Sequence, residues 1–379
     1  MKQLQNNALA FGLYVHVPFC TVRCGYCDFN TYTPSELEQA DAIHVWTQAL
    51  ISEITYSLEK LPKSQVVETI FFGGGTPSLL PLNNLEQIFS KLNDSFIFSE
   101  NIEITLEANP DTLSSSKIRA WKDFGINRIS LGVQSADKKV LQILDRTHNP
   151  ENVKNSVELL KNCGIHNFSL DLIYGTPGET LDSWSSSVES LVEFDPPHVS
   201  AYALTVEPGT ALFRKVNNKE IGNISSDDQA DKYLIANDIL EKNNLAWYEI
   251  SNWAIPGHEC RHNLLYWNNQ NWWGYGPGAH SHIDGKRWWN VKHPANYAKK
   301  LINEKSAIAD FETLSFDQKN LEQTMLLMRL RGSDLGELAP AAILSEWENL
   351  DYVSSGSNNL ELTPKGRLLL DSLIAQITP

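Results

Sequence analysis

The sequence has a deficit of basic residues and no long apolar run, and each absence excludes a class of protein. Its 379 residues contain 31 Lys and Arg against 46 Asp and Glu, a formal net charge of −15. Nucleic-acid phosphates and anionic lipid surfaces repel so acidic a chain, so general binding to either is not expected. No stretch approaches the roughly 20 apolar residues that cross a bilayer, and the first residues lack the apolar core of a signal peptide. The sequence therefore predicts a cytosolic protein.

Cysteine and phosphate-binding glycine motifs are also scarce. Five cysteines are too few for a disulfide framework, and in a reducing compartment they indicate metal binding or buried thiols. No G-x-G-x-x-G precedes a predicted helix and no GK[ST] is present, so neither dinucleotide nor P-loop binding is supported. The chain is 42% hydrophobic with 11 Trp, which predicts a folded protein with one large domain and a small one.

Three of the five cysteines lie within eight residues and form the most informative motif. Cys20, Cys24 and Cys27 follow the spacing Cys-x3-Cys-x2-Cys, whereas a closed zinc site or an ordinary ferredoxin centre uses four ligands. A [4Fe–4S] cluster on three thiolates keeps one iron open for the amino and carboxylate groups of S-adenosylmethionine (SAM). Electron transfer into the sulfonium would then release a carbon radical. The motif alone leaves open a zinc site completed by His16, or three thiols without a ligand.

Short apolar runs alternate with helical periodicity along most of the chain. The runs predict strands at 13–19, 66–72, 102–108, 128–134, 167–175 and 198–205, with a seventh at 246–254. Such alternation is typical of a parallel sheet covered by helices, and here it predicts an incomplete (β/α)6 TIM-like barrel.

The pattern changes near residue 310. Two helices, a short strand-turn-strand and a last helix outline a winged-helix-like module. Residues 310–379 carry 5 Lys and Arg against 11 Asp and Glu, so this module is not expected to bind DNA. We predict a partial barrel over 1–245, an aromatic-rich segment over 246–309 and the C-terminal module over 310–379.

Polar residues follow several predicted strands, where barrel proteins gather their chemistry. Residues 73–77, GGGTP, come after the second strand and would let a backbone approach a ligand closely. Glu107, Gln134 and Asp171 lie at later strand ends, and Arg146 could bind a carboxylate. Taken singly, the glycines are also compatible with a tight turn, the strand-end residues with solvated or helix-capping side chains, and Arg146 with a surface charge. Together with the three cysteines they outline one polar cavity, which favours a cluster over zinc.

The motifs YVHVPFCTVRCGYC, FFGGGTPSLL, LEANPDTL, ISLGVQS and LDLIYGTPGET resemble successive motifs of the radical SAM superfamily, specifically of the oxygen-independent coproporphyrinogen III oxidase family. The resemblance covers nearly the whole chain. It implies that Cys20, Cys24 and Cys27 bind the cluster. It also implies a SAM site made by Tyr14, Gly74, Gly75, Thr76, Glu107, Gln134, Arg146, Asp171 and Ala203.

Two departures from the oxidases point to another branch. Phe29 stands where the oxidases have a fourth cysteine, and the segment before the first strand is shorter. With CRHNLLYW at 260–267, these features resemble the HemW branch, which implies a haem chaperone. The His-Asn-x-x-Tyr-Trp motif of that branch, and with it the implied haem site, is His262, Asn263, Tyr266 and Trp267.

The residues alone support haem binding less specifically. Imidazole is a common axial ligand of haem iron, and aromatic rings suit a porphyrin face. Five Trp fall within 23 residues, at 267, 272, 273, 288 and 289. A core cluster with a structural His262 remains an alternative, and Cys260 is either a buried thiol or a second ligand. His280 and His282 lie in a Gly-rich turn that could line the same cavity, and neither is assigned to metal.

The resemblance therefore implies three ligands, a [4Fe–4S] cluster, SAM and haem, and haem-acceptor proteins as partners. It also suggests a homodimer, and peripheral membrane contact stays compatible with the sequence. The first alternative function is a SAM-dependent coproporphyrinogen III dehydrogenase, which removes carboxyl groups from porphyrinogen propionates. The second is a scaffold whose cluster only stabilises the fold.

Overall fold

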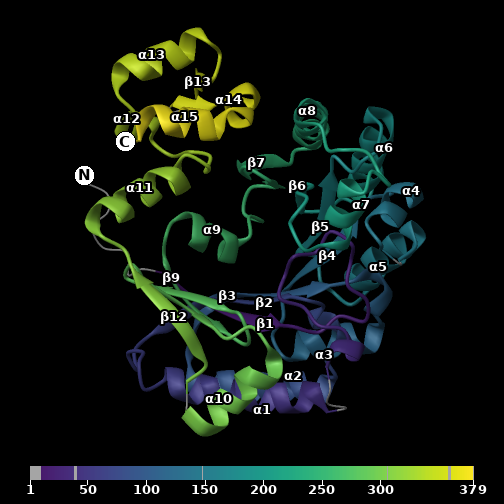
Figure 1. Cartoon of the computed structure of the whole chain (residues 1–379), viewed down its shortest axis with the longest axis vertical. Helices are drawn as coiled ribbons and strands as arrows, with labels where there is room; N and C mark the ends of the chain where they lie inside the picture. The colour runs from purple at the N-terminus through teal and green to yellow at the C-terminus, as the bar shows by residue number, and fades with distance from the viewer. Residues whose placement is uncertain (1–9, 38–40, 147, 305, 357–359, 379) are drawn as a thin grey trace.

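A computed structural model describes residues 10–37, 41–146, 148–304, 306–356 and 360–378 (Figure 1). The amino-terminal residues, on which the signal-peptide prediction rests, lie outside these ranges. Among the described residues, no helix is both long and apolar enough to cross a bilayer.

Six parallel strands form the centre of the fold. They pair in chain order and are β1 (Phe11–Val17), β2 (Val66–Gly74), β3 (Ile97–Ala108), β4 (Arg128–Gln134), β5 (Phe168–Tyr174) and β6 (His198–Ala203). The six strands predicted from the apolar runs are confirmed, with shifts of a few residues at their ends. β1 and β5 are buried at all but one position, as expected for strands covered on both faces.

Helices follow the strands and cover the outer face of the sheet (Figure 1). They are α1 (Ala42–Ser57), α2 (Leu82–Ser95), α3 (Ser115–Asp123), α4 (Lys138–Ile143), α5 (Pro150–Asn162), α6 (Leu181–Val192), α7 (Ala211–Asn217) and α8 (Ser226–Lys242). Single 3-10 turns occupy Pro34–Glu36, Pro77–Leu79 and Pro110–Thr112. The start of α5 shows the local cause of such boundaries: Pro150 is its first residue, and the Asn149 side chain accepts a hydrogen bond from the Glu151 N–H.

The sheet continues past both edges of the parallel strands and does not close. Beyond β6 lies β8 (Asn252–Ala254), which is antiparallel to β6, and beyond that lies β7 (Ala246–Glu249), which is antiparallel to β8. Beyond β1 lies β9 (Asn271–Tyr275), which is parallel to β1. It is followed by β10 (His280–Ile283), β11 (Lys286–Asn290) and β12 (Ile308–Thr313), each antiparallel to the strand before it. The result is one open 12-stranded sheet. The prediction of an incomplete α/β barrel is confirmed.

One predicted strand is wrong in form. Residues 246–254 make two short antiparallel strands, not one. The chain turns at Ile250 and Ser251, and the Ser251 N–H donates to the Glu249 carboxylate at 3.2 Å. This contact closes the turn, which apolar content alone does not reveal.

Two further helices flank the added strands. α10 (Pro294–Glu304) packs beside α1 on the outer face, whereas α9 (Arg261–Trp267) lies on the opposite side of the sheet (Figure 1). α9 carries the His-Asn-x-x-Tyr-Trp motif, so the motif faces the inner side of the partial barrel.

The C-terminal module has its own small core. It contains α11 (Phe316–Leu327), α12 (Leu335–Leu338), α13 (Ala341–Asn349), the paired β13 (Val353–Ser355) and β14 (Leu360–Leu362), α14 (Pro364–Leu368) and α15 (Leu370–Ile377). Trp347 and Leu373 are central to that core. The second predicted helix is divided at Pro340, which has no N–H to continue a helix. The boundaries at 245 and 309 stay predictions.

Candidate cluster and ligand site

A cavity of about 550 Å³ lies on the inner side of the partial barrel. The loop after β1, the glycines at the end of β2 and the ends of β3 to β6 all contribute to its wall. It is lined by Cys20, Cys24 and Cys27 and by every residue that the resemblance assigns to SAM, namely Tyr14, Gly74, Gly75, Thr76, Glu107, Gln134, Arg146, Asp171 and Ala203. The structure thus brings together residues from all six parallel strands and from the loops that follow them.

Each of two cysteine thiols has a polar neighbour from another loop. The Thr76 hydroxyl donates to Cys20 Sγ at 3.6 Å, and the Arg146 guanidinium donates to Cys24 Sγ at 3.4 Å. Burial raises the pKa of Cys27 to about 11 and also raises that of Cys20. Because a metal needs thiolates, its binding would release protons from these thiols.

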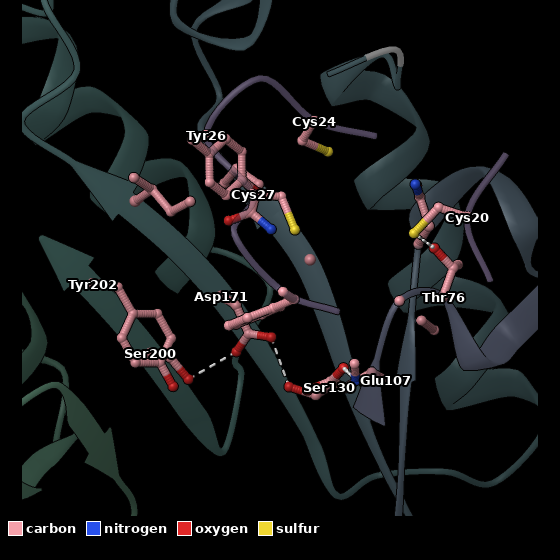
Figure 2. Close-up of a pocket in the computed structure, with 18 of the residues that line it drawn as sticks. Cys20, Cys24, Tyr26, Cys27, Thr76, Glu107, Ser130, Asp171, Ser200 and Tyr202 are labelled. Atoms are coloured by element: carbon pink, nitrogen blue, oxygen red, sulfur yellow. Dashed lines mark hydrogen bonds between the residues drawn. The ribbon is translucent and has the colours of Figure 1, made fainter. Parts of the chain in front are cut away.

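The three sulfur atoms border one space without converging on one point (Figure 2). Among the described residues, no three His, Cys, Asp or Glu side chains gather closely enough to hold a single metal ion. A zinc site needs that convergence, since each Zn–S bond is about 2.3 Å. A four-iron cluster instead spreads its thiolates over separate irons. The donor set and its spacing therefore fit a cluster better than zinc.

His16 does not complete a zinc site in this arrangement. Its Nε2 lies 2.8 Å from the Asn30 carbonyl and its Nδ1 lies 3.1 Å from the Tyr14 hydroxyl. Burial lowers the pKa of His16, which keeps the ring neutral. His16 is thus a structural histidine beneath the cysteine loop, and it does not line the cavity of the three thiols.

The glycines at the end of β2 bring the backbone close to its neighbours. Gly74 has φ +109°, a conformation that favours glycine, and a Cβ at Gly75 would lie 2.6 Å from the Phe19 carbonyl oxygen. The Gly74 N–H donates to the Glu107 carboxylate at 3.0 Å. Burial, with a smaller contribution from nearby Asp171, raises the pKa of Glu107 to about 8. Glu107 is therefore largely protonated at neutral pH.

Asp171 is fixed by three hydroxyls that the sequence analysis did not single out. Ser130 and Ser200 donate to its carboxylate at 2.6 and 2.8 Å (Figure 2), and Ser169 donates at 2.7 Å. Polar residues at alternate positions of the strands carry this signal, because alternate side chains share one face. The same rule could have found Arg128, His198, Tyr202 and Asn252, which also line the cavity.

Arg128 is unusual among these additional residues. Its side chain is on β4, only 2% of the residue is exposed, and its guanidinium makes no hydrogen bond within the described ranges. The negative charges of Glu103 and Asp171 lie nearby and raise its pKa against the opposing effect of burial. Arg128 places a positive charge at the floor of the cavity.

Three of the four motif residues on α9 open into this same cavity. His262, Asn263 and Tyr266 line it, whereas Trp267 lines neither cavity found in the described residues. The ring nitrogens of His262 are both engaged, at 2.7 Å from the Thr69 hydroxyl and 2.8 Å from the Tyr266 hydroxyl. Only 1% of His262 is exposed, and burial lowers its pKa to about 3. The ring is neutral and hydrogen-bonded on both sides.

Cys260 is a buried thiol at the start of α9. It lines the cavity, its Sγ lies 3.7 Å from the Glu103 carboxylate, and burial raises its pKa to about 12. Such a thiol stays protonated and is a poor ligand at neutral pH.

A second cavity, of about 650 Å³, adjoins the first. Tyr14, Phe29, Gly74, Glu107 and Tyr266 line both. The second cavity is completed by residues of β9 to β12 and of α11, which include Trp272, His280, Arg287, Glu312, Glu322 and Leu326. His282 is absent from both linings and is buried, with its ring bonded to the Gln270 carbonyl and the Gly285 N–H.

The fold and the site together define a radical SAM protein. The family model described as the Radical SAM superfamily matches residues 14–191. The chain is 43% identical over 371 residues to heme chaperone HemW of Mycobacterium tuberculosis, covering 96% of this chain and 94% of that protein. It is 30% identical to heme chaperone HemW of Escherichia coli, with 96% of each chain covered. The chain belongs to the HemW heme chaperone family.

A solved structure confirms the architecture. Coproporphyrinogen III oxidase (HemN) from Escherichia coli, a radical SAM enzyme, superposes with a TM-score of 0.83 over 98% of this chain and 90% of that one. The two sequences are 21% identical, so the similarity concerns the fold.

Proposed function

We propose that this protein carries haem to acceptor proteins in the cytosol and holds a [4Fe–4S] cluster and SAM beside its haem site. Cys20, Cys24 and Cys27 would bind the cluster. When bound, the cluster and SAM supply one-electron chemistry. The haem chaperones that the chain resembles over nearly its whole length support the haem-carrying role.

One observation carries this proposal: the His-Asn-x-x-Tyr-Trp motif opens into the cavity that the three thiols line. A motif used only for packing would not need to contribute three polar side chains to that wall. Phe29, which stands where the oxidases have a fourth cysteine, is 63% exposed and borders both cavities. Its place suits contact with a flat apolar cargo more than metal binding.

The remaining SAM residues have roles that follow from their chemistry. The backbone at Gly74, Gly75 and Thr76 would face the amino and carboxylate end of SAM. Glu107 and Asp171 would accept hydrogen bonds from the ammonium and hydroxyl groups. Tyr14, Gln134, Arg146 and Ala203 complete the lining.

His262, predicted as the haem ligand, would have to give up a hydrogen bond to bind iron. Its Nε2 is paired with the Tyr266 hydroxyl in a buried position. Breaking that pair leaves a buried hydroxyl unsatisfied, which costs about 1–3 kcal/mol. Asn263, which donates to Glu249 at 3.2 Å, and Trp267 would then act by holding α9 in place.

The proposal is tested with the full chain, reconstituted without oxygen. We expect about four irons and four sulfides per polypeptide, cleavage of SAM under reducing conditions, uptake of hemin, and transfer of that haem to apomyoglobin as a generic acceptor. Failure to take up hemin would contradict the chaperone role.

The same preparation tests the enzyme alternative. Coproporphyrinogen III is supplied with SAM and a reductant, and the products are separated by chromatography. We expect no protoporphyrinogen. Its formation would replace the chaperone with the oxidase, while iron without either SAM cleavage or haem uptake would favour a scaffold. A homodimer stays a prediction, to be measured by light scattering.

A further inference from the structure

We propose that His280 is the axial ligand of haem iron and that haem occupies the second cavity, beside the SAM site. This inference rests on the proposed function, because it names the residue and the place through which haem is carried. Sequence motifs point to His262 instead. The hydrogen bonds of the two histidines decide between them.

Four histidines line the two cavities, and three of them have both ring nitrogens engaged. His16 is bonded to Tyr14 and Asn30, His198 to Ser169 and Tyr248, and His262 to Thr69 and Tyr266. Within the described part of the chain, the His280 ring makes no hydrogen bond or ion pair. An imidazole with a free nitrogen binds iron without breaking an existing contact.

The surroundings of His280 suit a porphyrin. Its ring stacks on Trp289, with centroids 5.6 Å apart and planes at 24°. Trp272, Tyr266 and Phe29 add aromatic surface to the same cavity. The volume of about 650 Å³ falls in the usual range of roughly 300–1,000 Å³ for ligand pockets.

The charges around His280 suit both a neutral imidazole that binds iron and the carboxylates of haem. Burial lowers the pKa of His280, and the positive charges of Lys292 and Arg287 lower it further, against the opposing carboxylate of Glu312. The neutral ring is the form that binds metal. Arg287 lines the cavity, where it pairs with Glu322, and it is the cation available to meet a carboxylate of haem.

Accessibility separates the two histidines as well. His280 is exposed on β10, whereas His262, a residue of α9, is buried with 1% of its surface exposed. A cargo that must pass to another protein needs an open ligand site. The second cavity shares Tyr14, Glu107 and Tyr266 with the first, so haem there would lie next to SAM.

The test is a hemin titration of the full-length, cluster-loaded protein, followed by absorption difference spectra and by electron paramagnetic resonance. The variants are His280→Ala, His262→Ala and, as a control, His44→Ala, which removes an exposed histidine of α1. We expect His280→Ala to weaken hemin binding at least tenfold and to lose the histidine–iron signature. His262→Ala and His44→Ala should keep that signature.

Two further measurements separate coordination from packing. Metal-free protoporphyrin IX has no iron, so its affinity should be the same for wild type and His280→Ala. Added imidazole should restore the histidine–iron spectrum of His280→Ala. The inference is overturned if His280→Ala keeps the signature, or if it loses both porphyrins equally. Wild-type protein that takes up no hemin would instead refute the proposed function.

Discussion

At the scale of single residues, the protonation of Glu107 makes the stability of the fold depend on pH. Its folded-state pKa of about 8 lies above the ordinary value of 4.5, so the folded protein binds this proton more tightly than the unfolded chain. The contribution of this carboxyl group to the free energy of unfolding is fully present below pH 4.5 and is lost as the pH rises towards 8. We predict that Glu107→Gln removes this loss, which is on the order of a few kcal/mol. Thermal unfolding of wild type and Glu107→Gln from pH 5 to 9 measures this difference. Parallel plots of stability against pH for the two proteins would contradict the prediction.

The same carboxyl group predicts a proton release on SAM binding. The ammonium and sulfonium charges of SAM favour the ionised form of Glu107, so at pH 7 the proton should leave as SAM binds. Calorimetry in two buffers of different ionisation enthalpy would detect it. Glu107→Gln is the control, and equal proton release from this variant would assign the proton to another group.

Cys24 carries the prediction for metal loss. Cys24→Ala leaves two thiolates, too few to hold a cluster, so we expect the iron content, brown colour and SAM cleavage to disappear. Cys163→Ala is the matched control, because that cysteine is half-buried beyond the end of α5 and outside both cavities. Full iron retention in Cys24→Ala, measured by a colorimetric assay, would refute the cluster assignment.

Residue types and strand positions were enough to predict the polar wall around the cysteines. Glu107, Gln134 and Asp171 could be chosen because they end apolar strands. Strand alternation groups the hydroxyls that hold Asp171 and the Arg128 guanidinium on one face of their strands, but the sequence does not say which face points into the cavity. Hydrogen-bond state decides between His262 and His280, and no sequence pattern reports it.

At the scale of elements, Glu103 fixes the start of α9. Its carboxylate accepts from the N–H groups of Arg261 and His262, both at 3.1 Å, where a helix offers unpaired donors. We predict that Glu103→Ala destabilises the protein by about 1–3 kcal/mol, because two buried donors lose their acceptor. Denaturant unfolding measures the change, with Glu100→Ala, an exposed residue of the same strand, as the control.

Glu103→Ala should cost more than Glu103→Gln, because the Gln amide keeps one acceptor oxygen for these N–H groups while both variants remove the negative charge beside Arg128. Equal stability of all three variants and wild type would show that α9 is held by its apolar contacts alone.

The six parallel strands were predictable because fully buried strands read as short apolar runs. The edge strands were not. β9 to β12 contain Trp, His, Arg and Asn, and their aromatic clustering predicts a segment that packs on the barrel, not strands of its sheet. Their pairing depends on the register of β9 against β1, such as Leu13 opposite Trp273, which lies far away in sequence.

At the scale of the molecule, Arg367 attaches the C-terminal module to the barrel. It donates to the Tyr233 hydroxyl at 3.0 Å and to Asn237 Oδ1 at 2.9 Å, and its guanidinium lies 4.4 Å from the centre of the Trp247 ring. Only 3% of it is exposed. We predict that Arg367→Ala costs about 2–4 kcal/mol and exposes the segment around residues 328–340 to limited proteolysis.

Arg331→Ala is the control for this attachment. Its side chain is 43% exposed and pairs with Glu361 inside the module, a kind of contact worth about 0–1 kcal/mol. If Arg331→Ala and Arg367→Ala have the same stability and cleavage pattern, the buried contacts do not hold the module.

The wall common to the two cavities has a thermodynamic consequence. With Tyr14, Glu107 and Tyr266 facing both sides, a ligand that moves any of these groups changes the free energy of its neighbour's binding. Reciprocity then requires that the factor by which SAM alters haem affinity equals the factor by which haem alters SAM affinity. A single coupling free energy therefore sets both how SAM changes the binding of haem and how haem changes the binding of SAM.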